Sequence, residues 1–333
     1  MPDPSNPLVA RLWRANEIES VHRGCWVIVD TSGTVVHGAG SPTQGVFARS
    51  STKSLQALPL LETGAAAALG LSAEETAVAI SSHNGEPQHV EAATRLLGRV
   101  GLDEHDLRCG PQRPAGAADD APARRITNNC SGKHAGFLAT ASHIGQDPAT
   151  YLDPAGELQG RIRQTMLDMT DAPAHQLSTA IDGCSAPTFR LPLAALATGL
   201  ARMANPDQLD QPRAQACRRL VEAARRHPAL VGGTVTPRFD TALLAATEGR
   251  LFSKVGAEGV QTVGIVGSGL GFAAKIDDGS TRSLHRLTIG VLAALGHLSP
   301  REIDALDHWH DPVRRNHDGL EVGRHEIVPA VLP

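Results

Sequence analysis

The sequence contains very little lysine: only four of its 31 cationic side chains are lysines, and the others are arginines. A guanidinium stays protonated in proteins, so arginine supplies positive charge but cannot accept a proton as a base. Each remaining lysine is therefore a candidate for chemistry that arginine cannot perform, although arginine-rich codon usage would also leave a few lysines by chance. The four are Lys53, Lys133, Lys254 and Lys275.

Aromatic residues are also scarce, at 3%, so the core must rest on Ala, Leu, Val and Ile. The net charge of −4 argues against an electrostatic nucleic-acid binder. No run approaches the roughly 18 apolar residues of a membrane span, and residues 1–7 lack the basic and apolar regions of a signal peptide. We therefore expect a cytoplasmic protein with no nucleic-acid or membrane partner and a disordered N-terminus over residues 1–7.

The five cysteines form an odd and widely spread set, which is not the pattern of a disulfide framework. In a reducing compartment they can serve as buried thiols, reactive thiols or metal ligands. They are Cys25, Cys109, Cys130, Cys184 and Cys217.

Strand patterns lie at both ends of the chain and helical patterns lie between them. Residues 25–30 and 34–37 are typical of a hairpin, and residues 261–267 and 271–277 of two further strands. The glycines between these last two strands do not indicate a dinucleotide site, because a strand and not a helix follows them. Residues 8–333 are predicted to form one catalytic domain of one or two lobes, in the α+β class, with a mostly antiparallel sheet covered by helices. Helical patterns cover residues 52–63, 87–100, 133–143, 156–169, 191–204, 213–226, 283–297 and 300–309, a strand pattern covers 176–181, and 110–125 is predicted to be a surface loop.

Ser50 and Lys53 are spaced so that both side chains lie on one face at the start of a predicted helix. Burial favours the neutral amine, which can then accept the serine proton. A serine at a helix N-terminus also lies near backbone N–H groups that can stabilise an oxyanion. The pair is therefore a candidate nucleophile and base.

Two further motifs support this interpretation. Ser82 lies in a polar segment after an apolar run, and Lys254 begins a Lys-Val-Gly motif at a predicted strand edge. With Ser50 and Lys53 they match the S-x-x-K, S-x-N and K-x-G set of serine β-lactamases and penicillin-binding proteins. Only 32 residues separate the two serines, too few for the helical domain of a β-lactamase, and the Ser82 segment alone is more typical of a polar turn.

Cys130 and Lys133 share the same i,i+3 spacing, and Cys184 follows in a Gly-Cys-Ser segment. Two thiolates with a nearby nitrogen can hold zinc, although two buried cysteines in an ordinary core would give the same pattern. Asp182 is a candidate for binding a substrate ammonium and Arg49 for binding a carboxylate, although such residues are more often surface charges than ligands.

Taken together, these segments resemble the thermolabile, rhizobial-type (class 3) L-asparaginase family. The resemblance covers residues 20–330 in family order. It rests on residues 49–53, 56–59, 82–86, 129–136, 182–188, 254–259 and 275–279. The sequence departs from the family pattern at Ser54, Asn84 and Ser185, where proline, serine and glycine are common.

The resemblance implies a fold related to serine β-lactamases and glutaminases, usually as a homodimer. It implies two Ser–Lys tandems, Ser50 with Lys53 and Ser82 with Lys254. It also implies an auxiliary zinc ion on Cys130, Lys133 and Cys184, and a substrate pocket lined by Arg49, His134 and Asp182.

The sequence therefore predicts an L-asparaginase that converts L-asparagine to L-aspartate and ammonia through an acyl-enzyme, with Ser50 as nucleophile. Two alternatives remain open at this stage. One is a penicillin-recognising acyltransferase or β-lactamase, and the other is a zinc-stabilised binding protein whose Ser–Lys pairs are inert.

Overall fold

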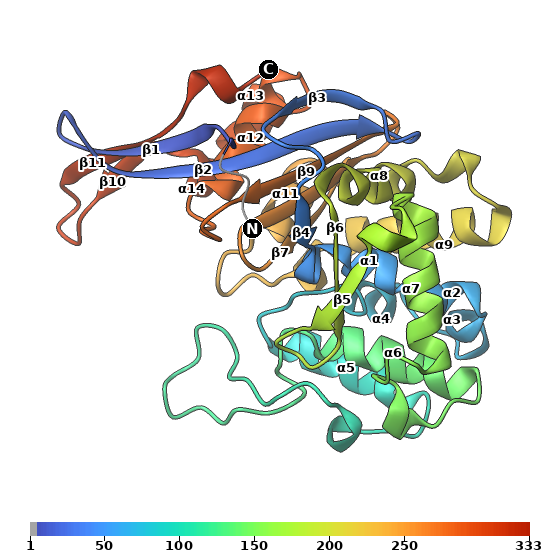
Figure 1. Ribbon diagram of the computed structural model, residues 1–333. Coiled ribbons are helices and arrows are strands. Elements are labelled where there is room, and N and C mark those ends of the chain that lie inside the picture. Colours follow the sequence, from blue (N-terminus) through green and yellow to red (C-terminus); the bar gives the residue numbers. More distant parts are fainter. Residues whose placement is uncertain (1–4) are drawn as a thin grey trace.

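An eight-stranded sheet and a body of helices make up the fold, which the computed structural model describes for residues 5–333 (Figure 1). All pairings between the named strands are antiparallel. The predicted α+β class with a mostly antiparallel sheet covered by helices is confirmed. No helix within residues 5–333 combines the length and apolarity needed to cross a membrane.

The large sheet runs in the order β10–β11–β1–β2–β9–β8–β7, with β3 paired to β2, and a small sheet runs β4–β6–β5. Strand β7 therefore forms one edge of the large sheet. The strands are β1 (Leu8–Arg14), β2 (Glu17–Asp30), β3 (Val35–Ala39), β4 (Gly45–Phe47), β5 (Ser178–Ile181), β6 (Pro187–Pro192), β7 (Leu251–Gly256), β8 (Val260–Ile265), β9 (Leu270–Ile276), β10 (Val313–Arg315) and β11 (Glu321–Ile327).

The helices occupy most of the middle of the chain, with a second group near the C-terminus. The α-helices are α1 (Lys53–Gln56), α2 (Leu58–Glu62), α3 (Ala65–Ala68), α4 (Ala73–Val78), α5 (Pro87–Gly98), α6 (Ser131–His143), α7 (Glu157–Thr170), α8 (Leu193–Ala204), α9 (Gln211–Arg226), α10 (Pro228–Val231), α11 (Phe239–Ala246), α12 (Leu284–Ala294), α13 (Pro300–Asp304) and α14 (Asp307–His310). Short 3₁₀ turns are η1 (Arg49–Thr52), η2 (Glu104–Asp106), η3 (Pro148–Thr150), η4 (Ala174–Gln176), η5 (Pro206–Gln208) and η6 (Pro329–Val331).

The buried half of β2 explains why helices cover both faces of the sheet. Successive side chains of a strand point to opposite faces. Val27 and Val29 belong to the core that includes α8, whereas Trp26 and Ile28 belong to the core that includes α12. The first of these cores continues through the helical body, so the sheet and the helices share one hydrophobic interior.

Several predicted boundaries change in the structure. The single helix predicted over residues 52–63 is instead η1, α1 and α2 in succession, and residues 300–309 form α13 and α14. The polar C-terminal stretch contains two strands, β10 and β11, which the sequence did not predict. Only one of their residues is buried and most are polar, so the two segments show no apolar alternation that would mark them as strands.

The predicted disordered segment, residues 1–7, lies partly outside the described residues. Within the described part, Asn6 is fully buried, and its amide donates to Gln44 Oε1 at 2.6 Å and to Asp277 Oδ1 at 2.9 Å. The chain is therefore anchored to the sheet from at least Asn6 onward.

Gly132 allows helix α6 to begin in direct contact with the end of α4. A Cβ atom at this position would lie 2.1 Å from the carbonyl oxygen of Val78. Backbone cannot move aside as a flexible side chain can, so this contact requires glycine. The close approach brings the first turn of α6 beside the segment that carries Ser82.

We predict that Gly132→Ala destabilises the protein by about 1–3 kcal/mol through overpacking, although alanine is ordinarily the better helix former. Gly160→Ala in α7 is the matched control, because a Cβ there meets nothing within 4 Å. Urea unfolding of both variants is the measurement. A Gly132→Ala protein as stable as the control would show that the contact is not tight.

Candidate active site

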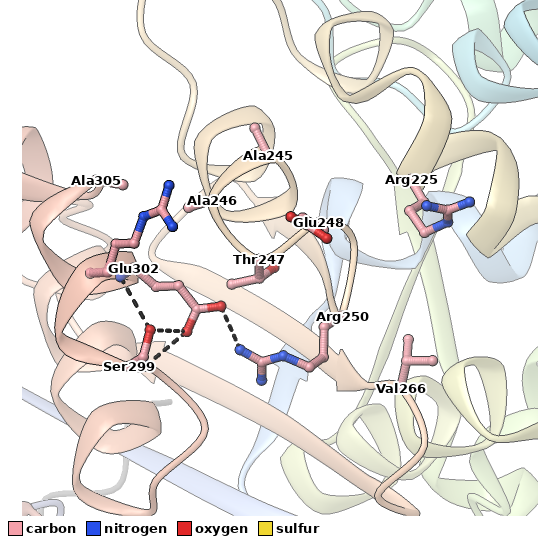
Figure 2. Close-up of a pocket in the computed structure, with 11 residues that line it drawn as sticks. Arg225, Ala245, Ala246, Thr247, Glu248, Arg250, Val266, Ser299, Glu302 and Ala305 are labelled. Atoms are coloured by element: carbon pink, nitrogen blue, oxygen red, sulfur yellow. Dashed lines mark hydrogen bonds and ion pairs between the residues drawn. The ribbon is translucent and has the colours of Figure 1, made fainter.

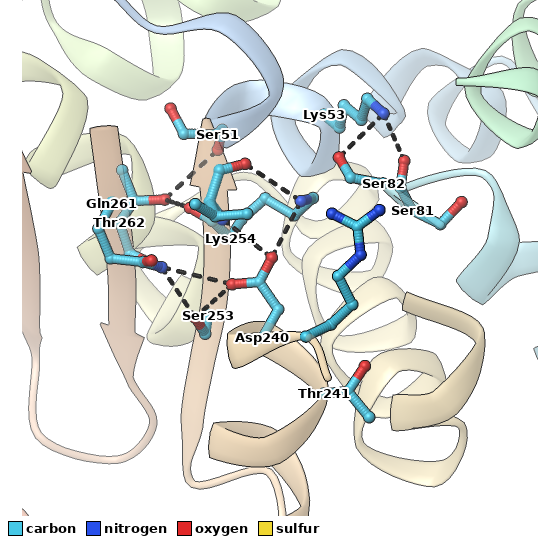
Figure 3. Close-up of polar contacts among 12 residues, drawn as sticks. Ser51, Lys53, Ser81, Ser82, Asp240, Thr241, Ser253, Lys254, Gln261 and Thr262 are labelled. Carbon is cyan, nitrogen blue, oxygen red and sulfur yellow. Dashed lines mark hydrogen bonds and ion pairs between the residues drawn. The ribbon is translucent and has the colours of Figure 1, made fainter. Parts of the chain in front are cut away.

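Five segments from different parts of the chain meet at one place, and one of them is the edge strand β7. They are η1 with α1, the loop after α4, the first turn of α6, the loop after β5, and β7 itself. The electrostatic neighbours of the Lys53 amine include Cys130, Lys133, Cys184 and Lys254, so the structure brings these predicted residues into one cluster. Figure 3 shows the part of this cluster that contains Lys53, Ser82 and Lys254.

The Lys53 amine lies at the centre of the cluster, with its side chain 1% exposed. Its Nζ lies 2.5 Å from the Ser81 carbonyl oxygen and 3.0 Å from Ser82 Oγ (Figure 3). It also lies 3.2 Å from the Asn129 carbonyl oxygen. Both carbonyl oxygens can only accept hydrogen bonds, whereas the serine hydroxyl can also donate one. A neutral amine with its two N–H groups on the carbonyls therefore directs its lone pair at Ser82.

Burial lowers the pKa of Lys53 from 10.5 to about 8. The cations Lys254 and Lys133 lower it further, while the thiols of Cys130 and Cys184 oppose this shift. A substantial fraction of Lys53 is therefore neutral slightly above neutral pH, as a general base requires.

The Ser–Lys pairing differs from the expected one. Within residues 5–333, Lys53 makes no hydrogen bond to Ser50, and it contacts Ser82 instead. Ser50 lies in the short turn η1, one residue after Arg49, whose φ of 51° is left-handed. The break between η1 and α1 removes the regular helix that the i,i+3 argument assumed.

Lys254 likewise contacts a different partner from the one expected. Its Nζ lies 3.1 Å from Asp240 Oδ2, with both side chains buried, and it also donates to the Val255 carbonyl oxygen at 3.2 Å. Gly256 allows β7 to approach η1, because a Cβ there would lie 2.5 Å from the Ala48 carbonyl oxygen. The third residue of the Lys-Val-Gly motif thus positions the first beside the serine segment.

The predicted zinc residues do come together. Lys133 Nζ lies 3.1 Å from Cys184 Sγ, and both cysteines are buried. A hydrogen bond from Cys184, with Lys53 and Lys133 nearby, lowers the pKa of Cys130 well below its usual range. The same bond raises the pKa of Cys184. This hydrogen bond therefore shifts the pKa values of the two neighbouring thiols in opposite directions.

The donor set is compatible with zinc, since two soft sulfur atoms and one nitrogen lie beside one another. The burial of Lys133 lowers its pKa, but the two thiols reverse this, so its net pKa is raised. A metal ion bound by Lys133 would have to displace a proton from its ammonium group. Within residues 5–333 no group of three or more His, Cys, Asp or Glu side chains is arranged to hold a metal, so Lys133 would have to be the third ligand.

The predicted substrate-binding residues Arg49 and Asp182 form an ion pair, with Arg49 Nε 2.8 Å from Asp182 Oδ1. Their side chains are 26% and 11% exposed, so the pair lies at a partly open edge of the cluster. A cavity of about 430 Å³ adjoins it and is lined by Arg49, Thr188 and Arg190 among others.

His134, the third predicted substrate-binding residue, is fully buried. Its Nδ1 lies 2.6 Å from the Tyr151 hydroxyl, which accepts the Arg108 backbone N–H at 2.8 Å. The Tyr151 hydroxyl must then donate to Nδ1, which leaves the proton of His134 on Nε2. Burial lowers the pKa of His134 well below 6.5, so it offers a neutral N–H donor, and Nε2 has no partner within residues 5–333.

A cavity of about 700 Å³ lies elsewhere and contains none of these residues (Figure 2). In this cavity the Arg250 guanidinium pairs with the Glu302 carboxylate. The same carboxylate accepts a hydrogen bond from the backbone N–H of Ser299.

Two polar groups of the cluster were missed by sequence reasoning. Asp240 is the one acidic residue in the otherwise mostly apolar helix α11, and it lies in the first turn. An acid in so apolar a segment could have indicated a buried carboxylate with a cationic partner. Tyr151 is the chain's only tyrosine, but nothing in its local sequence links it to His134.

A buried amine beside a serine hydroxyl is an arrangement that can activate the serine for attack on a carbonyl group. A model of the L-asparaginase II family matches residues 10–327. The chain belongs to the L-asparaginase II family, as the sequence resemblance predicted, and this family is one of asparaginase-type amide hydrolases.

Among solved structures, Mglu in its native form is 13% identical, with a TM-score of 0.48, and the match covers 88% of this chain and 69% of that one. A β-lactamase, Mb2281c from Mycobacterium bovis, is 14% identical, with a TM-score of 0.39, and the match covers 81% of this chain and 94% of that one. No curated protein matches the sequence.

We predict that activity requires the neutral form of Lys53. The value of kcat/KM should rise with pH and level off above the Lys53 pKa of about 8, because the fraction of neutral amine rises through that pH. Lys53→Arg should abolish the activity at every pH, since a guanidinium cannot accept the proton. An active, folded Lys53→Arg protein would contradict the assignment.

Proposed function

We propose that the chain is an L-asparaginase that hydrolyses the side-chain amide of L-asparagine to give L-aspartate and ammonia. The observation that carries the proposal is the contact of Lys53 Nζ with Ser82 Oγ at 3.0 Å, while two carbonyl oxygens hold the other positions of the amine. Membership in the L-asparaginase II family supports the choice of substrate.

In the first step, neutral Lys53 takes the hydroxyl proton of the serine, and Oγ bonds to the amide carbon. The C–N bond then breaks, and the departing nitrogen receives the proton from the Lys53 ammonium to leave as ammonia. The product is an ester of the serine with the β-carboxyl group of aspartate.

The second step reverses the roles of the same groups. Lys53, neutral again, takes a proton from water, whose oxygen bonds to the ester carbon. The bond between that carbon and Oγ breaks, and Lys53 returns the proton to the serine. Lys254 supplies positive charge near the developing oxyanion in both steps.

Arg49, His134 and Asp182 are proposed to bind the substrate. Arg49 and Asp182 already pair with each other, so an amino acid could be held by its carboxylate on one and its ammonium on the other. The Nε2–H of His134 would donate a further hydrogen bond.

The nucleophile is proposed to be Ser82, because it is the hydroxyl that contacts the base. Sequence reasoning had favoured Ser50, so both are tested. Ser82→Ala should abolish ammonia release from L-asparagine while circular dichroism shows an intact fold. Mass spectrometry of the trapped ester should locate it on Ser82. An ester on Ser50 would instead make Ser82 a proton relay, and the absence of both ester and ammonia would reject the function.

The same assay should include L-glutamine, D-asparagine and a chromogenic β-lactam. These substrates distinguish an asparaginase from the acyltransferase or β-lactamase alternative, and total inactivity with all of them would favour a binding protein. We further propose that the chain acts in the cytoplasm as a homodimer, and light scattering of the purified protein can test the dimer.

We propose that zinc binds to Cys130, Lys133 and Cys184 as an auxiliary ion. When bound, it would polarise water or orient substrate electrostatically. The fit rests on two buried sulfur atoms beside one amine.

Metal analysis should find about one zinc per chain in the purified protein, as expected for a closed sulfur–nitrogen site. Cys184→Ala should lose this zinc. Cys217→Ala, a buried thiol outside the cluster, should retain it. Undetectable zinc in a fully active protein would remove the proposal.

A further inference from the structure

We propose that the cavity beside Arg49 is a subsite for a second amino acid, so that the enzyme also deamidates short peptides whose first residue is L-asparagine. This inference rests on the proposed function and extends its substrate class from a free amino acid to a peptide. Water replaces the side-chain nitrogen, which leaves as ammonia, and the peptide bond stays intact. The product is the corresponding aspartyl peptide.

The cavity, of about 430 Å³, lies against the small sheet β4–β6–β5 and is large enough for a small-molecule ligand. Strand β4 ends two residues before Arg49, and β5 ends one residue before Asp182. The ion pair of these two residues therefore lies at the end of the two outer strands. The central strand β6 contributes Thr188 and Arg190 to the wall. A substrate held by the ion pair would thus have the cavity directly beside it.

Arg190 offers the cavity a positive charge that the protein itself does not use. Within residues 5–333 its guanidinium makes no hydrogen bond and no ion pair, whereas Arg49 is already bound to Asp182. Arg190 and Thr188 are two residues apart on one strand, so their side chains point to the same face of the small sheet. The Thr188 hydroxyl is buried and also lacks a hydrogen-bond partner in this part of the chain. One wall therefore holds two polar groups without protein partners.

Gly45 determines where the Arg190 guanidinium lies. An ideal Cβ atom at Gly45 would lie 2.4 Å from Cζ and Nη2 of Arg190 and 2.5 Å from its Nη1. The guanidinium therefore rests on the bare backbone of β4, and Gly45 itself lines the cavity. A planar guanidinium can bind a carboxylate through two parallel hydrogen bonds. Its position on the wall suits the C-terminal carboxylate of a short peptide.

The wall also contains Lys275, Glu258 and Asp277. Lys275 interacts electrostatically with both of these acids, whereas no acidic side chain pairs with Arg190 in the part of the chain that the structure describes. The acids thus have a cation of their own. Arg190 remains the cation that a ligand carboxylate can reach without competing with a protein carboxylate.

The rest of the cavity suits an apolar side chain. Phe47 and Ile181 line it and are 42% and 81% exposed, and Val46 and Ala180 line it as well. Contact with an apolar group removes such surface from water, which is favourable. The second residue of the peptide is therefore expected to have an apolar side chain and a free carboxylate.

The ion pair sets the order of the peptide. Asp182 would bind the ammonium of the first residue, so the chain continues from the carboxyl side, beside Arg49. The sheet register places Phe47 opposite Arg190, and Phe47 is only two residues before Arg49. The two arginines are therefore neighbours on the wall. One added residue, which spans up to about 3.6 Å, would carry the terminal carboxylate from Arg49 toward Arg190.

Four substrates test the subsite by ammonia release: L-asparagine, L-asparaginyl-L-leucine, the C-terminal amide of that peptide, and L-leucyl-L-asparagine. The value of kcat/KM for asparaginyl-leucine should exceed that for its amide by at least about tenfold, because the amide lacks the carboxylate. Leucyl-asparagine should be poor, since its asparagine has no free ammonium. Chromatography should show intact aspartyl-leucine as the product. Hydrolysis of asparagine without hydrolysis of asparaginyl-leucine would reject the subsite and leave the proposed function standing.

Two variants test Arg190 through the ratio of kcat/KM for asparaginyl-leucine to that for its amide. Arg190→Gln should bring this ratio close to one. Gly45→Ala keeps the charge but displaces the flexible guanidinium, so it should lower the ratio as well. Arg163→Gln, at an exposed arginine of α7, is the matched control and should leave the ratio unchanged. An unchanged ratio in Arg190→Gln would overturn the proposal.

Calorimetry covers the case in which no substrate releases ammonia and the proposed function fails. Tighter binding of asparaginyl-leucine than of its amide, with the difference lost in Arg190→Gln, would still support the subsite. Equal binding of the two peptides, or no binding of either, would overturn it.

Discussion

The site depends on one contact: a lysine amine buried against two backbone carbonyl oxygens and one serine hydroxyl. Each carbonyl accepts an N–H, and neither can donate, so the amine directs its lone pair toward Ser82. Backbone oxygens cannot be replaced by mutation, and here they belong to two separate segments, Ser81 and Asn129. The fold must therefore keep the loop after α4 and the approach to α6 in fixed register for the base to point correctly.

Charge balance is the second constraint, because burying several amines together is costly unless each has its own partner. The three buried lysines have different partners. Lys133 donates to the Cys184 sulfur and Lys254 to a carboxylate, whereas Lys53 has no carboxylate beside it and shares the influence of the thiols with Lys133. Burial is the main reason that the pKa of Lys53 falls to about 8, and the Cys130 sulfur is the strongest influence against that fall.

The sequence predicted the class of the fold and the residues that gather in the cluster. It did not predict which side chain each lysine contacts. The i,i+3 spacing of Ser50 and Lys53 assumed a regular helix, but the chain breaks between η1 and α1 at that point. Asp240 precedes Lys254 by 14 residues and reaches it because α11 packs beside β7, a packing that neither local pattern predicts. Strands β10 and β11 also escaped prediction, since their polar, mostly half-buried or exposed side chains show no apolar alternation.

The shortage of lysine was informative because arginine cannot lose its proton, and the positions of the four lysines in the structure agree with this argument. Three of the four lysines are buried in one cluster, and the fourth, Lys275, donates to the Glu258 carbonyl oxygen at 2.8 Å. A guanidinium is planar, carries five donors and cannot become neutral. It could not occupy the space between Ser81, Asn129 and Ser82 and still leave a lone pair for the hydroxyl. A chain that uses arginine elsewhere must therefore keep lysine at position 53 if that residue is to act as the base.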